Sequence, residues 1–308
     1  MRLFYYTSGK NFGDRINPWF WSHFLSVPMS EDPTEKELIL GIGTIINDRI
    51  PPAEKVHILG SGAGYGRYVP KAMPHWEVHW VRGPLTAQRI GVSSSKSIAD
   101  PALLLHRLMP PPSRKDLPVS FMPHVGIDSA RFERLTEDAG IHYISPTWEP
   151  AKVIDLVNRS ERLICSAMHG AIVADALRVP WCPVVTSPEI LAFKWYDWCT
   201  AMELEFKPET MLPLWDPVGP TVAHKVKARL KEWLVTRKLT SIVTRGRFFL
   251  STYAVLMNRV ARMEGIIAQF NLRFGCNSAV AERIVAVGEP ENQLDNSMSS
   301  GTGPRESK

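Results

Sequence analysis

The stretch "RLICSAMHGAIVADALRVPWCPVVT" (residues 162–186) contains a short apolar strand, a helix and a second apolar strand. The same alternation extends over residues 119–199. It predicts strands at residues 119–124, 142–147, 162–166 and 182–186, and helices at residues 129–139, 150–159, 171–178 and 188–199. Short apolar strands that alternate with amphipathic helices form parallel sheets with helices on both faces. This part of the chain is therefore expected to be α/β.

The N-terminal part shows a similar pattern and ends at a proline-rich segment. Strands are predicted at residues 3–7, 37–43, 55–62 and 77–83, with a helix over residues 84–90. The run "MPPPSRKDLP" (109–118) then suits a linker, because it holds four prolines. We expect two Rossmann-like domains that face a cleft. Their predicted bounds are residues 1–108 and residues 117–205.

The C-terminal part differs in composition. Residues 223–273 have interleaved basic and apolar positions and are predicted to be helical, within a basic extension over residues 206–287. The last 21 residues, 288–308, are polar and rich in Gly, Ser and Asn, so we expect them to be disordered.

The charge of the 308-residue chain is unevenly spread. The net charge is +5, yet residues 221–275 hold eleven Lys and Arg against two Glu. Nucleic acid, an anionic membrane surface or an acidic partner would each explain such a segment. One hypothesis is that its cations dock at an anionic membrane; the alternative is helices that pack back on the N-terminal domain with charges in water. The cations in question are Lys225, Lys227, Arg229, Lys231, Arg237 and Lys238.

Cysteine usage and the absence of targeting signals indicate a cytoplasmic protein. The four cysteines, at positions 165, 182, 199 and 276, form no Cys-x-x-Cys pair, so buried free thiols in a reducing compartment are expected. No signal peptide precedes the first strand, and the apolar run at residues 248–258 is too short to span a bilayer.

Ligands of open parallel sheets bind beyond the carboxyl ends of the strands. Ser166 ends one predicted strand and can cap the next helix, whose first turn holds His169 and Gly170. Free backbone N–H groups and the helix dipole favour an anion there. His169 is therefore a candidate to contact a phosphate or carry a proton, or else it hydrogen-bonds a neighbouring carbonyl.

Two further strand ends carry charged residues. Arg82 is placed to form a bidentate pair with a carboxylate or phosphate, or else it is a surface arginine packed on a helix end. We do not expect Arg82 to be part of the core.

Asp100-Pro101 and Asn17-Pro18 each read as a helix N-cap followed by proline. The opening helix should thus begin at Asn17 and leave residues 10–14 as an exposed loop. The glycines of "GSGAGYG" (60–66) lack the spacing of a dinucleotide fingerprint, and tight turns explain them.

Taken in order, six stretches resemble the polysaccharide pyruvyltransferase family, most closely its members in bacterial exopolysaccharide assembly. They are "NFGD" (11–14), "GIGTIIN" (41–47), "GSGAGYG" (60–66), "VRGPLT" (81–86), "ADPALL" (99–104) and "CSAMHGAIVADALRVP" (165–180). The resemblance covers roughly residues 5–200. It implies two Rossmann domains in a GT-B-like arrangement with a central cleft. It also implies transfer of pyruvate from phosphoenolpyruvate to a sugar, usually as a cyclic ketal.

The resemblance also assigns roles to residues. The loop with Lys10 and Asn11 would lie on the acceptor-sugar side, while Arg82, Ser166 and Gly170 would hold phosphoenolpyruvate. His169 would carry a proton, with Asp14 or Asp100 as base. Several relatives have an arginine two residues before the histidine, where this chain has Ala167. The missing cation would be supplied by one of three residues: Lys10, Arg15 or Lys194.

The expected partners are phosphoenolpyruvate as co-substrate, a lipid-linked oligosaccharide or polysaccharide repeat unit, and an anionic membrane surface. No other cofactor, no metal and no nucleic acid is expected. Two other functions stay open. One is a GT-B-type nucleotide-sugar glycosyltransferase, because a scaffold does not fix chemistry. The other is a non-catalytic scaffold at a membrane surface, which would depend on the basic helices alone.

Overall fold

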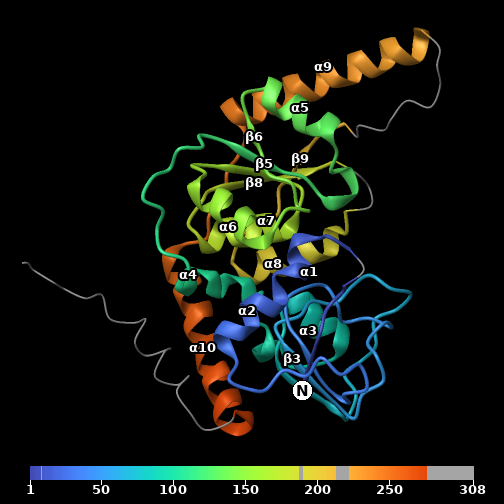
Figure 1. Cartoon of the computed structure of the whole chain (residues 1–308), viewed down its shortest axis with the longest axis vertical. Helices are drawn as coiled ribbons and strands as arrows, with labels where there is room; N and C mark the ends of the chain where they lie inside the picture. Colours follow the sequence, from blue (N-terminus) through green and yellow to red (C-terminus); the bar gives the residue numbers. More distant parts are fainter. Residues whose placement is uncertain (8, 187–189, 213–221, 276–308) are drawn as a thin grey trace, which may run out of the picture. The chain divides into compact units, whose positions relative to one another are not determined.

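The computed structural model describes residues 1–7, 9–186, 190–212 and 222–275 (Figure 1). Within these residues the chain forms two sheets, both entirely parallel, surrounded by helices. The predicted α/β class is therefore confirmed. The predicted disordered tail, residues 288–308, lies outside the described residues. All described residues belong to one compact unit, residues 1–276, so the expected division into two domains stays a prediction.

The first sheet has the strand order β1-β2-β3-β4. Its strands are β1 (Arg2–Phe4), β2 (Glu37–Leu40), β3 (Lys55–Leu59) and β4 (Trp76–Trp80). Leu38 and Leu40 pack into one apolar cluster, while Ile39, between them in sequence, packs into another. Because both faces are covered here, residues 38–40 of β2 are continuously apolar in the sequence.

The second sheet has the order β6-β5-β7-β8-β9. Its strands are β5 (Ser120–Met122), β6 (His142–Tyr143), β7 (Leu163–Cys165), β8 (Trp181–Val185) and β9 (Glu209–Thr210). The first four were predicted, and β9 was not. Leu163 and Cys165 pack on one face, and Ile164 packs on the other with Phe121. Cys165, Cys182 and Cys199 are buried free thiols, as expected.

Eight helices lie before the basic segment in the described part of the chain. They are α1 (Phe12–Arg15), α2 (Asn17–Phe24), α3 (Pro84–Ile90), α4 (Leu105–Leu108), α5 (Ala130–Asp138), α6 (Pro150–Arg159), α7 (Met168–Ala176) and α8 (Ala192–Ala201). Three single 3-10 turns are η1 (Ser94–Lys96), η2 (Pro101–Leu104) and η3 (Val125–Ile127). The helix predicted at residues 171–178 thus begins three residues earlier, at Met168, so that His169 lies in its first turn as expected.

Two capping predictions and one loop prediction have different outcomes. Asp100 does cap η2, since its side chain accepts a hydrogen bond from the Ala102 N–H. Helix α2 begins at Asn17, but the Asn17 amide donates to carbonyls of neighbouring segments and does not cap. Residues 10–14 are not simply an exposed loop, because α1 starts at Phe12, which is buried against the core.

The basic segment forms two helices, α9 (Val222–Arg245) and α10 (Tyr253–Phe274). Helix α10 buries Leu256, Val260, Met263, Ile267 and Phe270, spaced three or four residues apart. It is fastened to the first part of the chain by Glu264 with Arg107 and by Asn271 with the Phe24 carbonyl. The alternative prediction, in which the basic helices pack back on the N-terminal part of the chain, is therefore correct for α10. No helix among the described residues is long and apolar enough to cross a membrane.

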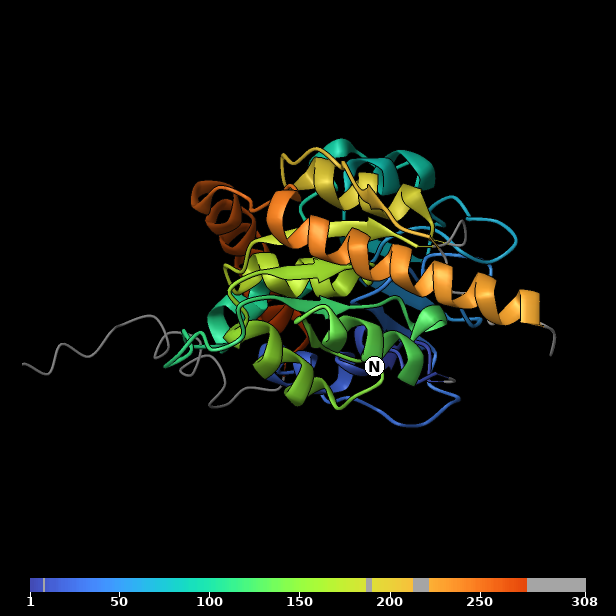
Figure 2. The ribbon, with the colours of Figure 1, turned by 90° about the horizontal axis from the view of Figure 1, so that it is seen from above.

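Helix α9 packs on the second sheet with its C-terminal half only. Val235, Leu239 and Ile242 join the cluster that covers β5, β7 and β8. Figure 2 shows α9 passing over these strands beside α5 and continuing beyond them. In its N-terminal half, Val226, Leu230 and Trp233 are 60%, 54% and 51% exposed. The segment thus carries exposed apolar side chains as well as cations.

Candidate active site

A cavity of about 260 Å³ lies at the carboxyl ends of strands from both sheets. Segments that follow β1, β2, β3, β5 and β7 line it, together with α8. Its polar lining includes Asp14, Thr44, Tyr65, His124, His169 and Lys194. The placement agrees with the rule that parallel sheets bind ligands at this edge. The cavity brings together four predicted site residues: Asn11, Asp14, His169 and Lys194.

His169 is held between two neighbouring segments. On one side its Nε2 atom lies 3.7 Å from Oδ2 of Asp100, which is fully buried at the start of η2. On the other side its ring is so close to Gly13 that a Cβ at this position would overlap Nδ1. Because Gly13 has no side chain, the imidazole has room at this position. Helix α7 packs on η2, which explains why His169 and Asp100 meet.

Asp14 faces the cavity from helix α1. It accepts a hydrogen bond of 2.8 Å from Asn11 Nδ2. Burial raises the pKa of this carboxyl, and the Asn11 hydrogen bond and nearby His169 and Lys194 only partly oppose the rise. A carboxyl with a raised pKa keeps its proton to higher pH than an exposed one and can act as an acid.

Lys194 is the cation on the cavity wall. Its Nζ donates to the Tyr65 hydroxyl at 2.8 Å, and the side chain is only 7% exposed. Burial, together with the smaller effect of the nearby charge of Arg82, lowers the pKa of Lys194 to about 8. Of the three cations considered for the missing arginine, Lys194 lines the same cavity as Ala167 and His169.

Arg82 is not on the wall of the cavity. Its side chain is 0% exposed, so the expectation that it lies outside the core is wrong. Nε pairs with Asp197 at 3.2 Å, and Nη1 donates to the Thr44 hydroxyl at 2.7 Å. Among the described residues, Nη2 has no hydrogen-bond partner. Arg82 therefore lies behind Thr44, which itself faces the cavity. The guanidinium that was expected to bind a ligand carboxylate or phosphate points into the protein instead.

Ser166 and Gly170 support the cavity without lining it. Ser166 was predicted to cap α7, but it does not. Its hydroxyl instead accepts a hydrogen bond of 2.7 Å from the His124 N–H. It thereby ties the end of β7 to the end of β5. Gly170 is buried against Met122 of β5, where a Cβ would crowd the sulfur. Both residues hold α7 close to the second sheet.

Four polar residues of the cavity were missed by sequence reasoning: Tyr6, Thr44, Tyr65 and His124. Thr44 and Tyr65 follow predicted strands, while Tyr6 and His124 lie at the carboxyl ends of predicted strands, so the strand-end rule that selected Arg82 and His169 would also have found them. Burial lowers the pKa of His124 to about 4, and the charge of Lys194 contributes. His124 is therefore neutral at physiological pH.

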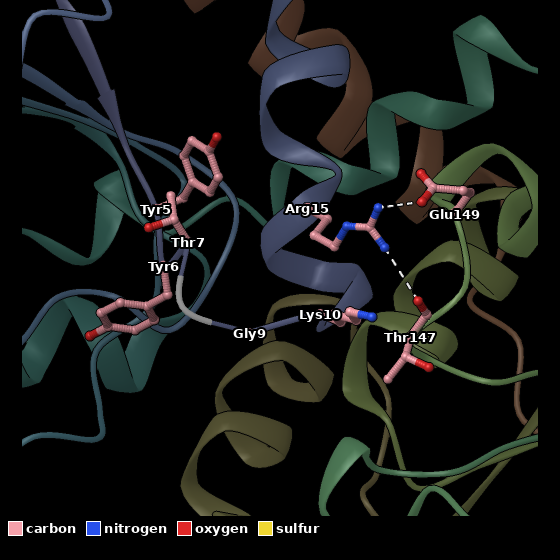
Figure 3. Close-up of a pocket in the computed structure, with 8 residues that line it drawn as sticks. All are labelled: Tyr5, Tyr6, Thr7, Gly9, Lys10, Arg15, Thr147 and Glu149. Carbon is pink, nitrogen blue, oxygen red and sulfur yellow. Dashed lines mark hydrogen bonds and ion pairs between the residues drawn. The ribbon is translucent and has the colours of Figure 1, made fainter.

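Lys10 and Arg15 line a second, more open cavity of about 460 Å³ (Figure 3). Arg15 pairs with Glu149 at 2.6 Å and donates to the Thr147 carbonyl at 3.3 Å. Tyr6 belongs to the walls of both cavities, so they adjoin. Aromatic and polar side chains in an open groove suit a sugar, whereas the smaller cavity concentrates the titratable groups needed for chemistry.

Comparisons with known proteins agree with the resemblance seen in the sequence. The sequence model of a family described as polysaccharide pyruvyl transferase matches residues 31–188. The succinoglycan biosynthesis protein ExoV of Rhizobium meliloti (strain 1021) is 37% identical over 213 residues, which cover 68% of this chain and 67% of that protein. No solved structure is significantly similar to the chain. The family match includes Asp100 and His169 and ends before Lys194.

Proposed function

Because the chain belongs to the polysaccharide pyruvyl transferase family and is therefore a transferase, we propose that it transfers pyruvate from phosphoenolpyruvate to a sugar of an exopolysaccharide repeat unit. Similarity to a protein of succinoglycan biosynthesis supports the exopolysaccharide acceptor. The observation that carries the proposal is the single cavity shared by Asp14, His169 and Lys194.

Phosphoenolpyruvate would bind in the smaller cavity. Its phosphate and carboxylate need cations or N–H donors. Lys194 supplies a charge on the wall, and Arg82 adds positive potential from behind Thr44. The first turn of α7 provides backbone N–H groups beside His169. We place the donor between Lys194 and this turn.

The chemistry then needs one acid and one base. Asp14, whose pKa is raised by burial, would give its proton to the methylene carbon of phosphoenolpyruvate and create a cation at C2. One sugar hydroxyl attacks C2 and passes its proton to His169. The C2–O bond to phosphate breaks, and phosphate leaves with that proton. A second hydroxyl closes the ketal and returns a proton to Asp14.

Asp100 would assist by its charge. It faces Nε2 of His169 from a fully buried position, so an imidazolium formed during the reaction would be stabilised. It does not line the cavity and so would act through His169. The acceptor sugar would lie in the larger cavity, on the side of Lys10 and Arg15, with Tyr6 at the junction.

The test is phosphate release from phosphoenolpyruvate with lipid-linked oligosaccharides of the source organism as acceptors, with mass spectrometry of the product. We expect a pyruvate ketal on the acceptor. His169→Ala should lower kcat by about a hundredfold or more, while the matched variant His23→Ala, at an exposed histidine, should keep wild-type turnover. Near-normal turnover of His169→Ala at saturating donor would make the histidine structural. Sugar transfer from a nucleotide sugar instead would overturn the whole proposal.

We further propose that the N-terminal half of α9 docks at an anionic membrane surface, where lipid-linked acceptors reside. Exposed apolar side chains at Val226, Leu230 and Trp233 would enter the interface. The lysines and arginines among them would add on the order of 1 kcal/mol each at most, an effect that salt screens.

Liposome sedimentation tests the docking. Anionic vesicles should pellet the protein and neutral vesicles should not, with the binding fading as salt rises. Trp233→Ala with Lys225→Gln and Lys227→Gln should weaken binding, whereas Lys36→Gln, at an exposed lysine that directly precedes β2, should not. Equal pelleting with both vesicle types would refute docking without touching the pyruvyl transfer.

A further inference from the structure

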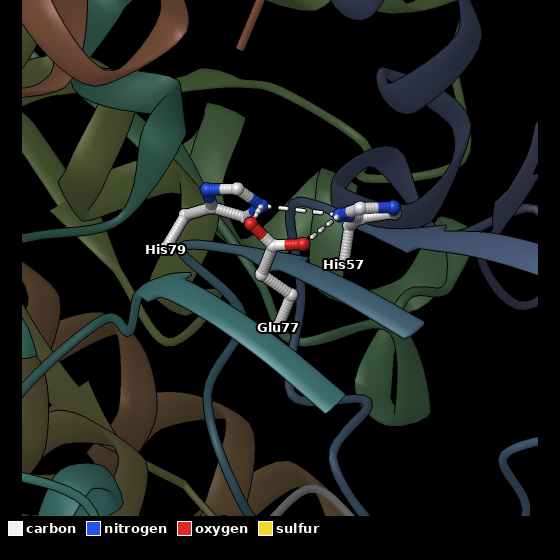
Figure 4. A group of neighbouring side chains, drawn as sticks. All are labelled: His57, Glu77 and His79. Atoms are coloured by element: carbon white, nitrogen blue, oxygen red, sulfur yellow. Dashed lines mark hydrogen bonds and ion pairs between the residues drawn. The ribbon is translucent and has the colours of Figure 1, made fainter. Parts of the chain in front are cut away.

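A cluster of imidazoles and carboxylates lies on one face of the first sheet, on strands β2, β3 and β4. His57 is paired directly opposite Glu77 across β3 and β4, and His79 lies two residues further along β4. The pairing shifts at this point, where Leu59 lies opposite Trp80, so that His79 is an extra residue without an opposite partner. Such β-bulges re-aim side chains. Here the bulge leaves the two imidazoles side by side (Figure 4).

The separations between the potential ligand atoms match those around a small metal ion. His57 Nδ1 lies 3.1 Å from His79 Nε2, and Glu77 Oε2 lies 3.8 Å from His57 Nδ1. Glu77 Oε1 lies 3.9 Å from His79 Nε2. Ligands about 2.0–2.2 Å from a tetrahedral zinc are roughly 3.3–3.6 Å apart, so only small shifts would be needed.

A second carboxylate fixes the tautomer of His57. Nε2 of His57 lies 2.9 Å from Glu37 Oε1, and an ionised carboxylate only accepts hydrogen bonds. The proton of neutral His57 is therefore on Nε2, and the lone pair of Nδ1 points to the space shared with His79 and Glu77. A carboxylate that orients a histidine in this way is a common feature of metal sites.

Helix α10 covers the cluster. Phe270 and Phe274 meet the His57 ring edge-on at 5.2 and 4.9 Å, and His57 is fully buried. Burial lowers the pKa of both imidazoles, that of His79 to about 4. His79 also borders a groove beside α10, which gives access from water.

We propose that His57, Glu77 and His79 form a binding site for a divalent zinc-like cation, with Glu37 orienting His57. In the cation-bound form His79 carries its proton on Nδ1, and water from the groove completes the coordination. Lys55 and Arg273 also contact Glu77, so they compete with the cation and limit its affinity. The cation would link the neighbouring strands β3 and β4 beneath the helix that covers them, a structural role independent of pyruvyl transfer.

The experiment is a titration of the full-length, EDTA-treated protein with Zn²⁺ by calorimetry, repeated with Co²⁺ by visible absorption. We expect one Zn²⁺ per chain, a rise in the unfolding temperature, and Co²⁺ bands of a nitrogen- and oxygen-ligated site. Glu77→Gln and His79→Ala should each lower the Zn²⁺ affinity at least tenfold. His75→Ala, at a neighbouring histidine outside the cluster, should bind like the wild type.

Melting curves without metal first establish that both variants are folded, and His79→Gln replaces His79→Ala if that variant is not. Absence of saturable one-to-one binding by the wild type overturns the proposal. So does a loss smaller than tenfold in either ligand variant, because Zn²⁺ would then bind elsewhere.

Discussion

Nε2 of His169 lies 3.7 Å from Oδ2 of Asp100, and neither atom has a hydrogen-bond partner among the described residues. The two residues come from different parts of the fold, since Asp100 precedes η2 and His169 is in the first turn of α7. The other oxygen of Asp100 caps η2, which fixes the carboxylate in place. The pair is therefore arranged so that a charge on the imidazole meets an opposite charge.

Asp100→Asn should lower kcat with little change in KM for phosphoenolpyruvate. The asparagine oxygen can still cap Ala102, so the fold is retained, but the charge that faces Nε2 is lost. We expect a decrease in kcat of about tenfold to a hundredfold, measured by phosphate release. A variant that instead raises KM alone would show that Asp100 serves donor binding.

Lys194→Met should weaken donor binding and remove a pH dependence. The pKa of Lys194 is lowered to about 8, so the free enzyme loses this cation as the pH rises through about 8. In the wild type, kcat/KM for phosphoenolpyruvate should therefore fall above pH 8. In Lys194→Met it should be lower at pH 7 and lack that step, whereas Lys36→Met should follow the wild-type profile. A step that persists in Lys194→Met must belong to another group.

Lys194 should affect the pH dependence of stability in the opposite sense to that of donor binding. Folding lowers the pKa of Lys194 from its ordinary 10.5, so the unfolded chain binds more protons between about pH 8 and 10.5. The contribution of Lys194 to the free energy of unfolding thus increases with pH over this range. Urea unfolding at several pH values, wild type against Lys194→Met, measures that contribution as a difference.

Arg82→Ala should destabilise the protein, and not only weaken donor binding. Removing the guanidinium leaves Asp197 as an uncompensated buried charge, although Thr86 still donates to it. Breaking a buried pair in this way costs about 3–5 kcal/mol of unfolding free energy. Arg89→Ala, at an exposed position of helix α3, which follows Arg82 in the chain, should cost about 0.5 kcal/mol or less. Similar urea midpoints for both variants would contradict the structural role.

Gly13→Ala should slow turnover while the protein stays folded. The new methyl group would overlap Nδ1 of His169, and the ring must shift because the neighbouring backbone of α1 is buried. We expect a loss of about tenfold or more in kcat, since small displacements of a reacting group are costly. Gly265→Ala, where a Cβ meets nothing within 4 Å, should be fully active. Crystals of Gly13→Ala with an unmoved His169 would remove the reason for this prediction.

Local patterns of residues are sufficient to predict the class of fold and the edge of the sheets at which the site lies. Apolar strands that alternate with amphipathic helices are a local pattern, and a strand covered on both faces is largely apolar. The eight predicted strands therefore all appear, in two parallel sheets. Because function collects at the carboxyl ends of such strands, Asp14 and His169 could be selected without knowing that they share a cavity.

Which of these residues meet depends on how distant segments pack. Arg82 reads like His169 in the sequence, yet Asp197, 115 residues away, draws its guanidinium into the core. In the sequence, Lys194 does not differ from other lysines. Its burial beside Tyr65, which lowers its pKa, is seen only in the structure. Helices α9 and α10 share a basic, apolar composition, but α10 buries one face along its length, whereas α9 buries apolar side chains only in its C-terminal half. Contacts between distant segments depend on packing in three dimensions, and no local pattern of residues contains that information.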